Sequence, residues 1–102
     1  MRIVKKATLA VYGAQNPQAK SGLEHWYQVT RKAEWACFLE VRATFPHADQ
    51  VTVKSGRKTV VFNIGGNKYR LITAIHYNRR LVFTLMVLTH AQYGKDEWKD
   101  VL

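Results

Sequence analysis

Three side chains in the last third of the chain, Arg70, His90 and Tyr93, are suited to acid–base chemistry on a phosphodiester. In RNA cleavage without a metal, the ribose 2′-OH attacks its own adjacent phosphate and expels the 5′-oxygen. This reaction needs a base, an acid and a cation that stabilises the charge developing on the phosphorane. Arginine, histidine and tyrosine can supply these roles. All three residues are expected where strand ends and turns converge, with Asn67 and Lys68 nearby.

The same residues also have purely structural interpretations. His90 follows an apolar strand and could cap it through a backbone hydrogen bond, and Tyr93 could close the core over the sheet. His76, in the middle of an expected strand, is interpreted as structural or as a surface residue. From the residues alone, plain binding is therefore favoured over catalysis.

The chain lacks the residues that other kinds of phosphodiesterase use. Two-metal sites need clustered carboxylates, and the chain has no Asp or Glu from residue 50 to residue 95. The four histidines are scattered without ligand spacing or cysteine companions, which argues against zinc. Gly65-Gly66 belongs to a hairpin rather than to a phosphate-binding strand–helix turn. The sequence predicts no metal and no cofactor.

The distribution of charge indicates the partner. The 16 Lys and Arg residues exceed the seven acids, giving a net charge of +9 and a pI near 10.0. Such an excess favours phosphate polymers or an acidic protein as partners. Because acids are missing throughout the strand-forming half, we expect its surface to contact RNA. The residues expected to position RNA are Lys54, Arg57, Lys58, Asn67, Lys68, Arg79, Arg80 and Lys95.

Helices are predicted in the first half. Apolar residues recur at helical spacing from Ala7 to about Gly13, and Asn16-Pro17 is typical of a helix start. The helix that follows presents Ala19, Leu23, Trp26 and Tyr27 on one face. A third helical stretch is predicted over 35–41. Cys37 lies in the apolar run of that stretch and is predicted to be a buried, structural thiol.

After Pro46 the pattern changes to strands. Strands are predicted over 50–54, 59–64, 69–77 and 81–88, with a hairpin turn at Gly65-Gly66-Asn67. The almost wholly apolar stretch 81–88 is typical of a central strand covered on both faces. Residues 2–5 are a possible edge strand, and residues 96–102 a possible short helix.

This order predicts one domain, residues 1–102, of the α+β class: N-terminal helices packed on a small twisted antiparallel sheet in two layers. The basic N-terminus leads into an apolar stretch too short for a signal peptide, and no run approaches the ~20 apolar residues that span a bilayer. We therefore expect a cytoplasmic protein without membrane contact.

Several segments resemble the HigB family of type II toxins. The similarity is greatest in VFNIGGNKYRLI, residues 61–72, and in THAQY, residues 89–93, after an apolar strand. Residues 1–4, the helix containing Trp26 and the stretch 42–46 are similar too. The resemblance therefore covers nearly the whole chain.

The resemblance implies a RelE-like fold and an mRNA endonuclease that cuts translated messages on the ribosome. It also implies a HigA-type antitoxin with a helix-turn-helix domain, the complex of the two binding promoter DNA. Arg70 would stabilise the phosphate, since a guanidinium can bind two phosphate oxygens, and His90 and Tyr93 would be the acid and base candidates. One departure is Gly94, where the family pattern often has an acid.

Two other functions compete with the nuclease. ParE-type proteins share the RelE fold and inhibit DNA gyrase without cleaving RNA, and fold alone does not decide function. The second competitor is a basic RNA- or DNA-binding module, such as a ribosome-associated factor.

Overall fold

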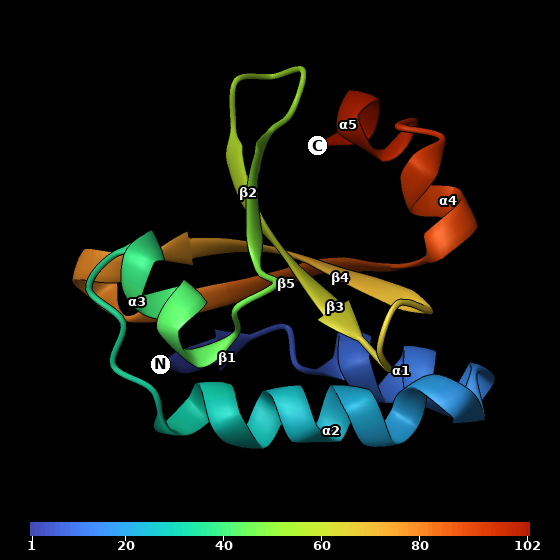
Figure 1. Cartoon of the computed structure of the whole chain (residues 1–102), viewed down its shortest axis with the longest axis horizontal. Coiled ribbons are helices and arrows are strands. Elements are labelled where there is room, and N and C mark those ends of the chain that lie inside the picture. Colours follow the sequence, from blue (N-terminus) through green and yellow to red (C-terminus); the bar gives the residue numbers. More distant parts are fainter.

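One five-stranded sheet carries α-helices on both of its faces (Figure 1). The structure is a computed structural model that describes residues 1–102. In chain order, its elements are β1 (Arg2–Val4), α1 (Ala7–Gln15), α2 (Pro17–Lys32), α3 (Phe38–Thr44), β2 (Asp49–Thr52), β3 (Lys58–Ile64), β4 (Tyr69–His76), the 3-10 turn η1 (Tyr77–Arg79), β5 (Leu81–Thr89), α4 (His90–Gly94) and α5 (Trp98–Val101).

The sheet has the strand order β1-β5-β4-β3-β2. The last four strands are antiparallel neighbours, as predicted, and the α+β class with helices on the sheet is confirmed. The edge strand β1 differs, because it pairs with β5 in parallel, with Arg2 opposite Leu81 and Val4 opposite Phe83. Parallel neighbours need a long connection, and here nearly the whole chain lies between the two strands. The sheet is therefore mixed.

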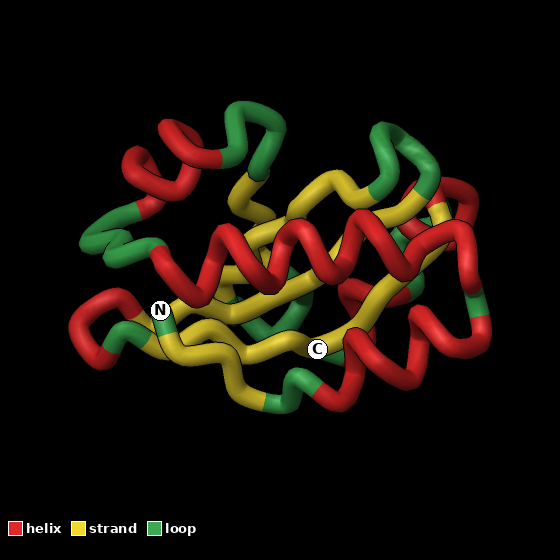
Figure 2. Tube along the Cα trace, turned by 90° about the horizontal axis from the view of Figure 1, so that it is seen from below, coloured by secondary structure: helices red, strands yellow, loops and turns green.

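The main core lies between the sheet and the layer of α1 and α2, and α2 lies in front of the strands in the view from below (Figure 2). Leu23 and Trp26 of α2 pack with Phe62 of β3 and Leu71 of β4, all of them buried. The rings of Trp26 and Phe62 meet edge to face, with centroids 5.3 Å apart. These residues confirm the helix face and the strand alternation predicted from the sequence.

Helix α2 approaches the β3–β4 hairpin closely at Gly22. A Cβ atom at this position would lie 2.8 Å from Cγ2 of Ile64 and 3.0 Å from the backbone nitrogen of Gly65. Only a residue without a side chain permits this approach. The contact holds the hairpin, and with it the residues that follow the turn, against the helical layer.

The opposite face of the sheet has a smaller core of Val53, Val61, Ile72 and Trp98. Trp98 comes from α5, so the C-terminal segment covers part of this face while α1 and α2 cover the other (Figure 1).

No helix in the structure combines the length and the apolar character that crossing a bilayer requires.

Three local predictions were wrong in detail. The third helix begins at Phe38 rather than at residue 35, and Trp35 instead packs in the core, where its Nε1 donates to Oγ1 of Thr44 over 3.0 Å. Cys37 is exposed, because it occupies the extended position just before that helix rather than its buried face. The first helix continues past Gly13 to Gln15.

Candidate active site and nucleic-acid interface

Arg70 lies on the sheet face opposite α1 and α2, beside the β3–β4 turn. Its cross-strand neighbours are Asn63 and Leu88. The guanidinium Nη1 donates to the carbonyl oxygens of Asn67 and Tyr69, over 3.0 and 3.1 Å. These two bonds hold the planar group at the end of the sheet.

His90 is the first residue of α4 and lies next to Arg70. Its backbone N–H donates to the carbonyl of Lys68 over 2.9 Å, which joins α4 to the hairpin turn. Its Nδ1 lies 3.1 Å from Nη2 of Arg70. An arginine can only donate, so this contact is a hydrogen bond in the tautomer whose Nδ1 accepts and whose hydrogen lies on Nε2. The Nε2–H is left for a further partner.

A capping box starts α4 at the end of β5. The side chain of Thr89 accepts from the backbone N–H of Gln92 over 3.2 Å, and the side chain of Gln92 accepts from the backbone N–H of Thr89 over 3.0 Å. This reciprocal pair satisfies two free helix donors. It turns the chain so that His90 and Tyr93 both reach Arg70.

Tyr93 completes the cluster from the next turn of α4. Its ring centroid lies 5.6 Å from Cζ of Arg70, and the ring is also stacked on Trp98, with centroids 5.3 Å apart and planes at 19°. Nε1 of Trp98 also donates to the carbonyl of Tyr93 over 3.1 Å. Burial raises the pKa of the Tyr93 phenol, and the charge of Asp49 raises it further. The phenol is therefore neutral at pH 7 and can donate a hydrogen bond.

The three predicted catalytic residues thus meet at one corner of the sheet, where His90 is exposed and Arg70 and Tyr93 are half-buried. Asn67 and Lys68 lie beside them in the hairpin turn. The amide of Asn63 donates to Oδ1 of Asn67 over 3.4 Å and shares this face. A guanidinium, an imidazole and a neutral phenol at one corner can bind a phosphodiester and exchange protons with its 2′- and 5′-oxygens.

The other predicted RNA-binding residues divide between two places. Lys54 and Lys95 line a hollow of about 470 Å³ beside α5, which also contains acids. The backbone N–H of Lys54 donates to the carbonyl of Lys99 over 3.1 Å, which draws the β2–β3 hairpin, with the exposed Arg57 and Lys58, toward the C-terminal segment.

Arg79 and Arg80 lie at the far end of β4. Six residues of strand separate that end from Arg70, roughly 20 Å at the usual rise. Arg80 also forms an exposed ion pair with Glu34, 3.3 Å between nitrogen and oxygen. The structure does not bring these two arginines to the site of Arg70.

Several residues of the site were not predicted from the sequence. Asn63 was visible only as a polar position in an alternating strand, on the same face as Arg70. Asp49 is opposite Val61 across the β2–β3 pair, and therefore also faces the side of Tyr93. Trp98 contributes by stacking on Tyr93, and Gln92 contributes through the capping box of α4.

No three His, Cys, Asp or Glu side chains gather closely enough to hold a metal ion.

Comparison with known proteins points to one family. Residues 19–96 match the family model described as HigB toxin, the RelE-like toxic component of a toxin–antitoxin system. Among individual proteins, the mRNA interferase HigB of Escherichia coli O6:H1 is 27% identical over 95 residues, which covers 93% of this chain and 90% of that protein. The matched region includes both the hairpin with Arg70 and the α4 segment with His90 and Tyr93.

Proposed function

From the premise that this chain belongs to the HigB family, the RelE-like toxic components of toxin–antitoxin systems, we propose that it is an endoribonuclease that cleaves mRNA at the corner formed by Arg70, His90 and Tyr93. The observation that carries the proposal is the direct contact of Arg70 with both other residues, of which His90 is exposed. The similar protein named an mRNA interferase supports the same reaction.

The chain's own groups suffice for a balanced cleavage step. A substrate phosphate takes the Arg70 guanidinium as a bidentate partner, which frees Nδ1 of His90. The imidazole then has a lone pair that can accept the 2′-OH proton and an N–H that can protonate the leaving 5′-oxygen. The 2′-oxygen forms a bond to phosphorus as the bond from phosphorus to the 5′-oxygen breaks. The products are a 2′,3′-cyclic phosphate and a 5′-hydroxyl, and the neutral Tyr93 phenol donates to a phosphate oxygen.

No metal has a role in this scheme. We expect the purified protein, alone or with ribosomes, to go on cleaving RNA when a chelator such as EDTA removes transition metals. The concentration of free magnesium is held constant at a level that keeps ribosomes intact. Loss of cleavage on depletion of a transition metal, with recovery when that metal is returned, would contradict the metal-independent step.

Further parts of the proposal concern partners. The family is a component of toxin–antitoxin systems, and the net charge of +9 suits an acidic protein partner and RNA. We propose that the partner is a HigA-type antitoxin with a helix-turn-helix domain, through which alone the complex binds promoter DNA. We also propose that the protein cleaves messages on the ribosome and therefore acts in the cytoplasm.

The deciding experiment maps new 5′ ends in cellular mRNA after induction of wild type, of Arg70→Ala and of Arg79→Ala. The last variant loses the same charge at a position remote from the site. Cuts within translated frames are expected with wild type and Arg79→Ala and not with Arg70→Ala. Growth arrest with intact mRNA would overturn the nuclease in favour of a poison of the gyrase-binding kind, and normal growth would leave only a basic binding module.

A further inference from the structure

Asp49 is the only acidic residue in the sheet. Its side chain is exposed and belongs to neither of the two ion pairs of the structure, which use Glu34 and Asp96. It lies on the same face as Arg70, where a negative charge repels the phosphates of RNA. An unpaired acid beside a site that acts on RNA therefore needs a partner other than phosphate.

The register of the sheet places Asp49 near Arg70. Asp49 is opposite Val61 and Arg70 is opposite Asn63, and these two partners face the same side because they are two residues apart on β3. At the usual strand spacing and rise, the Cα atoms of Asp49 and Arg70 lie roughly 12 Å apart. A phosphate bound to the arginine therefore leaves an adjoining base within reach of the carboxylate.

Tyr93 lies between these two charges. Its ring packs against the small core that contains Val61, the cross-strand partner of Asp49, and its centroid lies 5.6 Å from Cζ of Arg70. Burial raises the pKa of the phenol most, the charge of Asp49 raises it further, and the charge of Arg70 lowers it. Asp49 and Arg70 therefore border the same small surface.

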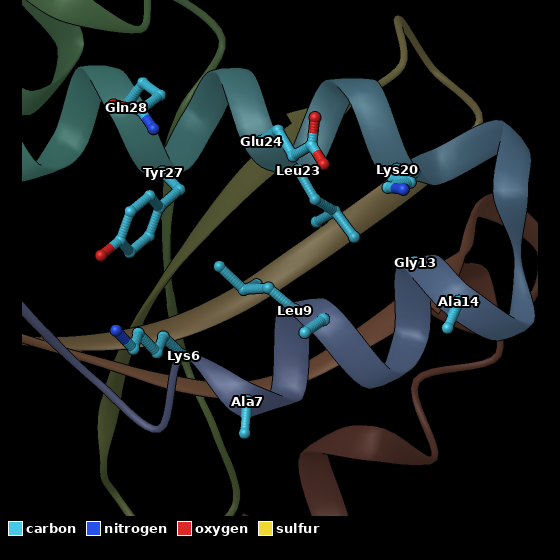
Figure 3. Close-up of a pocket in the computed structure, with 11 residues that line it drawn as sticks. Lys6, Ala7, Leu9, Gly13, Ala14, Lys20, Leu23, Glu24, Tyr27 and Gln28 are labelled. Carbon is cyan, nitrogen blue, oxygen red and sulfur yellow. The ribbon is translucent and has the colours of Figure 1, made fainter.

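The other six of the seven acids lie elsewhere. Glu24 of α2 borders a groove of about 570 Å³ between α1 and α2, on the opposite face of the sheet (Figure 3). Glu34 is paired with Arg80 beyond the far end of β4, and Glu40 belongs to α3. The remaining three belong to the C-terminal segment, namely Asp96, Glu97 and Asp100. Asp49 is thus the one acid that a strand presents beside the Arg70 corner.

We propose that Asp49 reads a base next to the cleaved phosphate and that it selects guanine. The inference deepens the proposed nuclease function and rests on it. The Watson–Crick edge of guanine has two adjacent donors, N1–H and the N2 amino group, and the two oxygens of a carboxylate can accept from both. Unpaired bases in RNA are commonly recognised on this edge.

The other bases fit a carboxylate less well. Adenine and cytosine each offer one amino group next to a ring nitrogen that only accepts, and uracil offers one N–H between two carbonyl oxygens. The negative charge of Asp49 lowers the affinity for every RNA, and a base that donates twice to the carboxylate offsets this loss most fully. The residue therefore gives specificity through repulsion as well as attraction.

Messages on purified ribosomes test the proposal when they differ only in the bases that flank one cleavage site. The value of kcat/KM is measured for wild type, Asp49→Asn and Glu24→Gln. The first change replaces one carboxylate oxygen with an amino group, and the second removes the same charge on the opposite face of the sheet. Both positions are exposed, so the fold is expected to persist, which circular dichroism checks.

Wild type should cleave the message with guanine about 10-fold or more faster than the same message with another base at that position. Asp49→Asn should reduce this preference to less than about threefold. It should also cleave the adenine and uracil messages at least as fast as wild type does, because a charge that repels phosphate is gone. Glu24→Gln should keep the preference of wild type.

An equal fall in the cleavage of all messages by Asp49→Asn would mean that the carboxylate acts on the reacting atoms and not on a base, and it would overturn the inference. An unchanged guanine preference in Asp49→Asn, or a wild-type preference for another base, would overturn the inference and leave the nuclease intact. Absence of cleavage of every message by wild type would overturn the nuclease and the inference together.

Discussion

The guanidinium of Arg70 donates to Nδ1 of His90 over 3.1 Å, so two of the groups expected to act on RNA satisfy each other in the free protein. A phosphate that draws the guanidinium away makes the imidazole lone pair available at the same moment. Binding of the correct group and activation of the histidine are thereby one event. A cation that binds phosphate but does not bond Nδ1 of His90 should therefore keep RNA binding and lose cleavage.

Arg70→Lys tests this coupling. The lysine keeps the charge but loses the planar guanidinium, which donates to the turn carbonyls. A guanidinium can also bond two phosphate oxygens at once, and an ammonium cannot do so in the same way. We expect cleavage in single-turnover assays to fall by about 100-fold or more, while RNA affinity changes by less than about threefold. Arg79→Lys is the matched control and should cleave like wild type. Cleavage by Arg70→Lys within a few-fold of wild type would contradict a special role for the guanidinium.

Trp98 is predicted to be a positioning residue for Tyr93. Trp98→Phe preserves an aromatic ring for the stack but removes the Nε1–H that donates to the Tyr93 carbonyl. Loss of this bond should cost about 1 kcal/mol of unfolding free energy. It should also lower kcat more than it raises KM. In a Tyr93→Phe background the same change should have little further effect on kcat, and an additive loss would show that Trp98 acts independently of Tyr93.

The two ends of β4 should contribute differently to RNA binding. Lys68 lies beside the site and Arg79 at the far end, and both are exposed. Lys68→Ala should weaken binding of single-stranded RNA and reduce the slope of log K against log salt by about 0.7. Arg79→Ala should leave the slope unchanged when the RNA is only long enough to cover the Arg70 corner. Equal losses in the two variants would extend the interface along the whole sheet.

Two helical glycines should respond in opposite directions to alanine. A Cβ at Gly13 would meet Lys20 at 3.5 Å, an ordinary contact, so Gly13→Ala should stabilise the protein by about 0.5–1 kcal/mol through helix propensity. At Gly22 the same atom would lie 2.8 Å from Ile64, so Gly22→Ala should destabilise it by roughly 1–3 kcal/mol. Urea unfolding measures both. A gain of stability in Gly22→Ala would mean that the hairpin can move away from α2.

The protein should lose stability at alkaline pH through three half-buried tyrosines. Burial raises the pKa values of Tyr12, Tyr77 and Tyr93 above the ordinary value of 10.0. The stability from the higher folded-state pKa is present in full below pH 10, and it is lost as the pH rises through the raised values. The hydroxyl of Tyr77 is buried without a hydrogen-bond partner, which makes Tyr77→Phe a mild substitution.

The measurement is the difference in unfolding free energy between wild type and Tyr77→Phe from pH 8 to pH 12. Taking the difference cancels the titration of other groups. Wild type should lose stability relative to the variant above pH 10, and a constant difference over the whole range would rule out this contribution of Tyr77.

Much of the fold was predictable because its elements carry local patterns. Val60, Phe62 and Ile64 alternate and do face the core, and 81–88 is a strand with neighbours on both sides. The five-residue helix α4 was not predicted, since it is too short for apolar periodicity and begins instead through a capping box. The parallel pairing of β1 depends on β5, nearly eighty residues away, and no local pattern specifies it.

The candidate site shows the same division. Arg70 and His90 were expected together because a strand end and a strand exit meet at the β3–β4 turn, and they lie in contact. Arg79 and Arg80 were grouped with them because of their charge alone. Charge does not indicate at which end of a strand a residue lies. Trp98 was not predicted as part of the site because its role comes from stacking against Tyr93 in the folded chain.

The parallel pairing of β1 with β5 has a consequence for biosynthesis. Arg2–Val4 leaves the ribosome first and finds its partner strand only when residues 81–83 have emerged, and the helix with His90 and Tyr93 comes later still. At about 5–20 residues per second, the nascent chain spends several seconds without a complete sheet or site. A cell that makes this protein is thus exposed to its folded, site-bearing form only after the chain is almost finished.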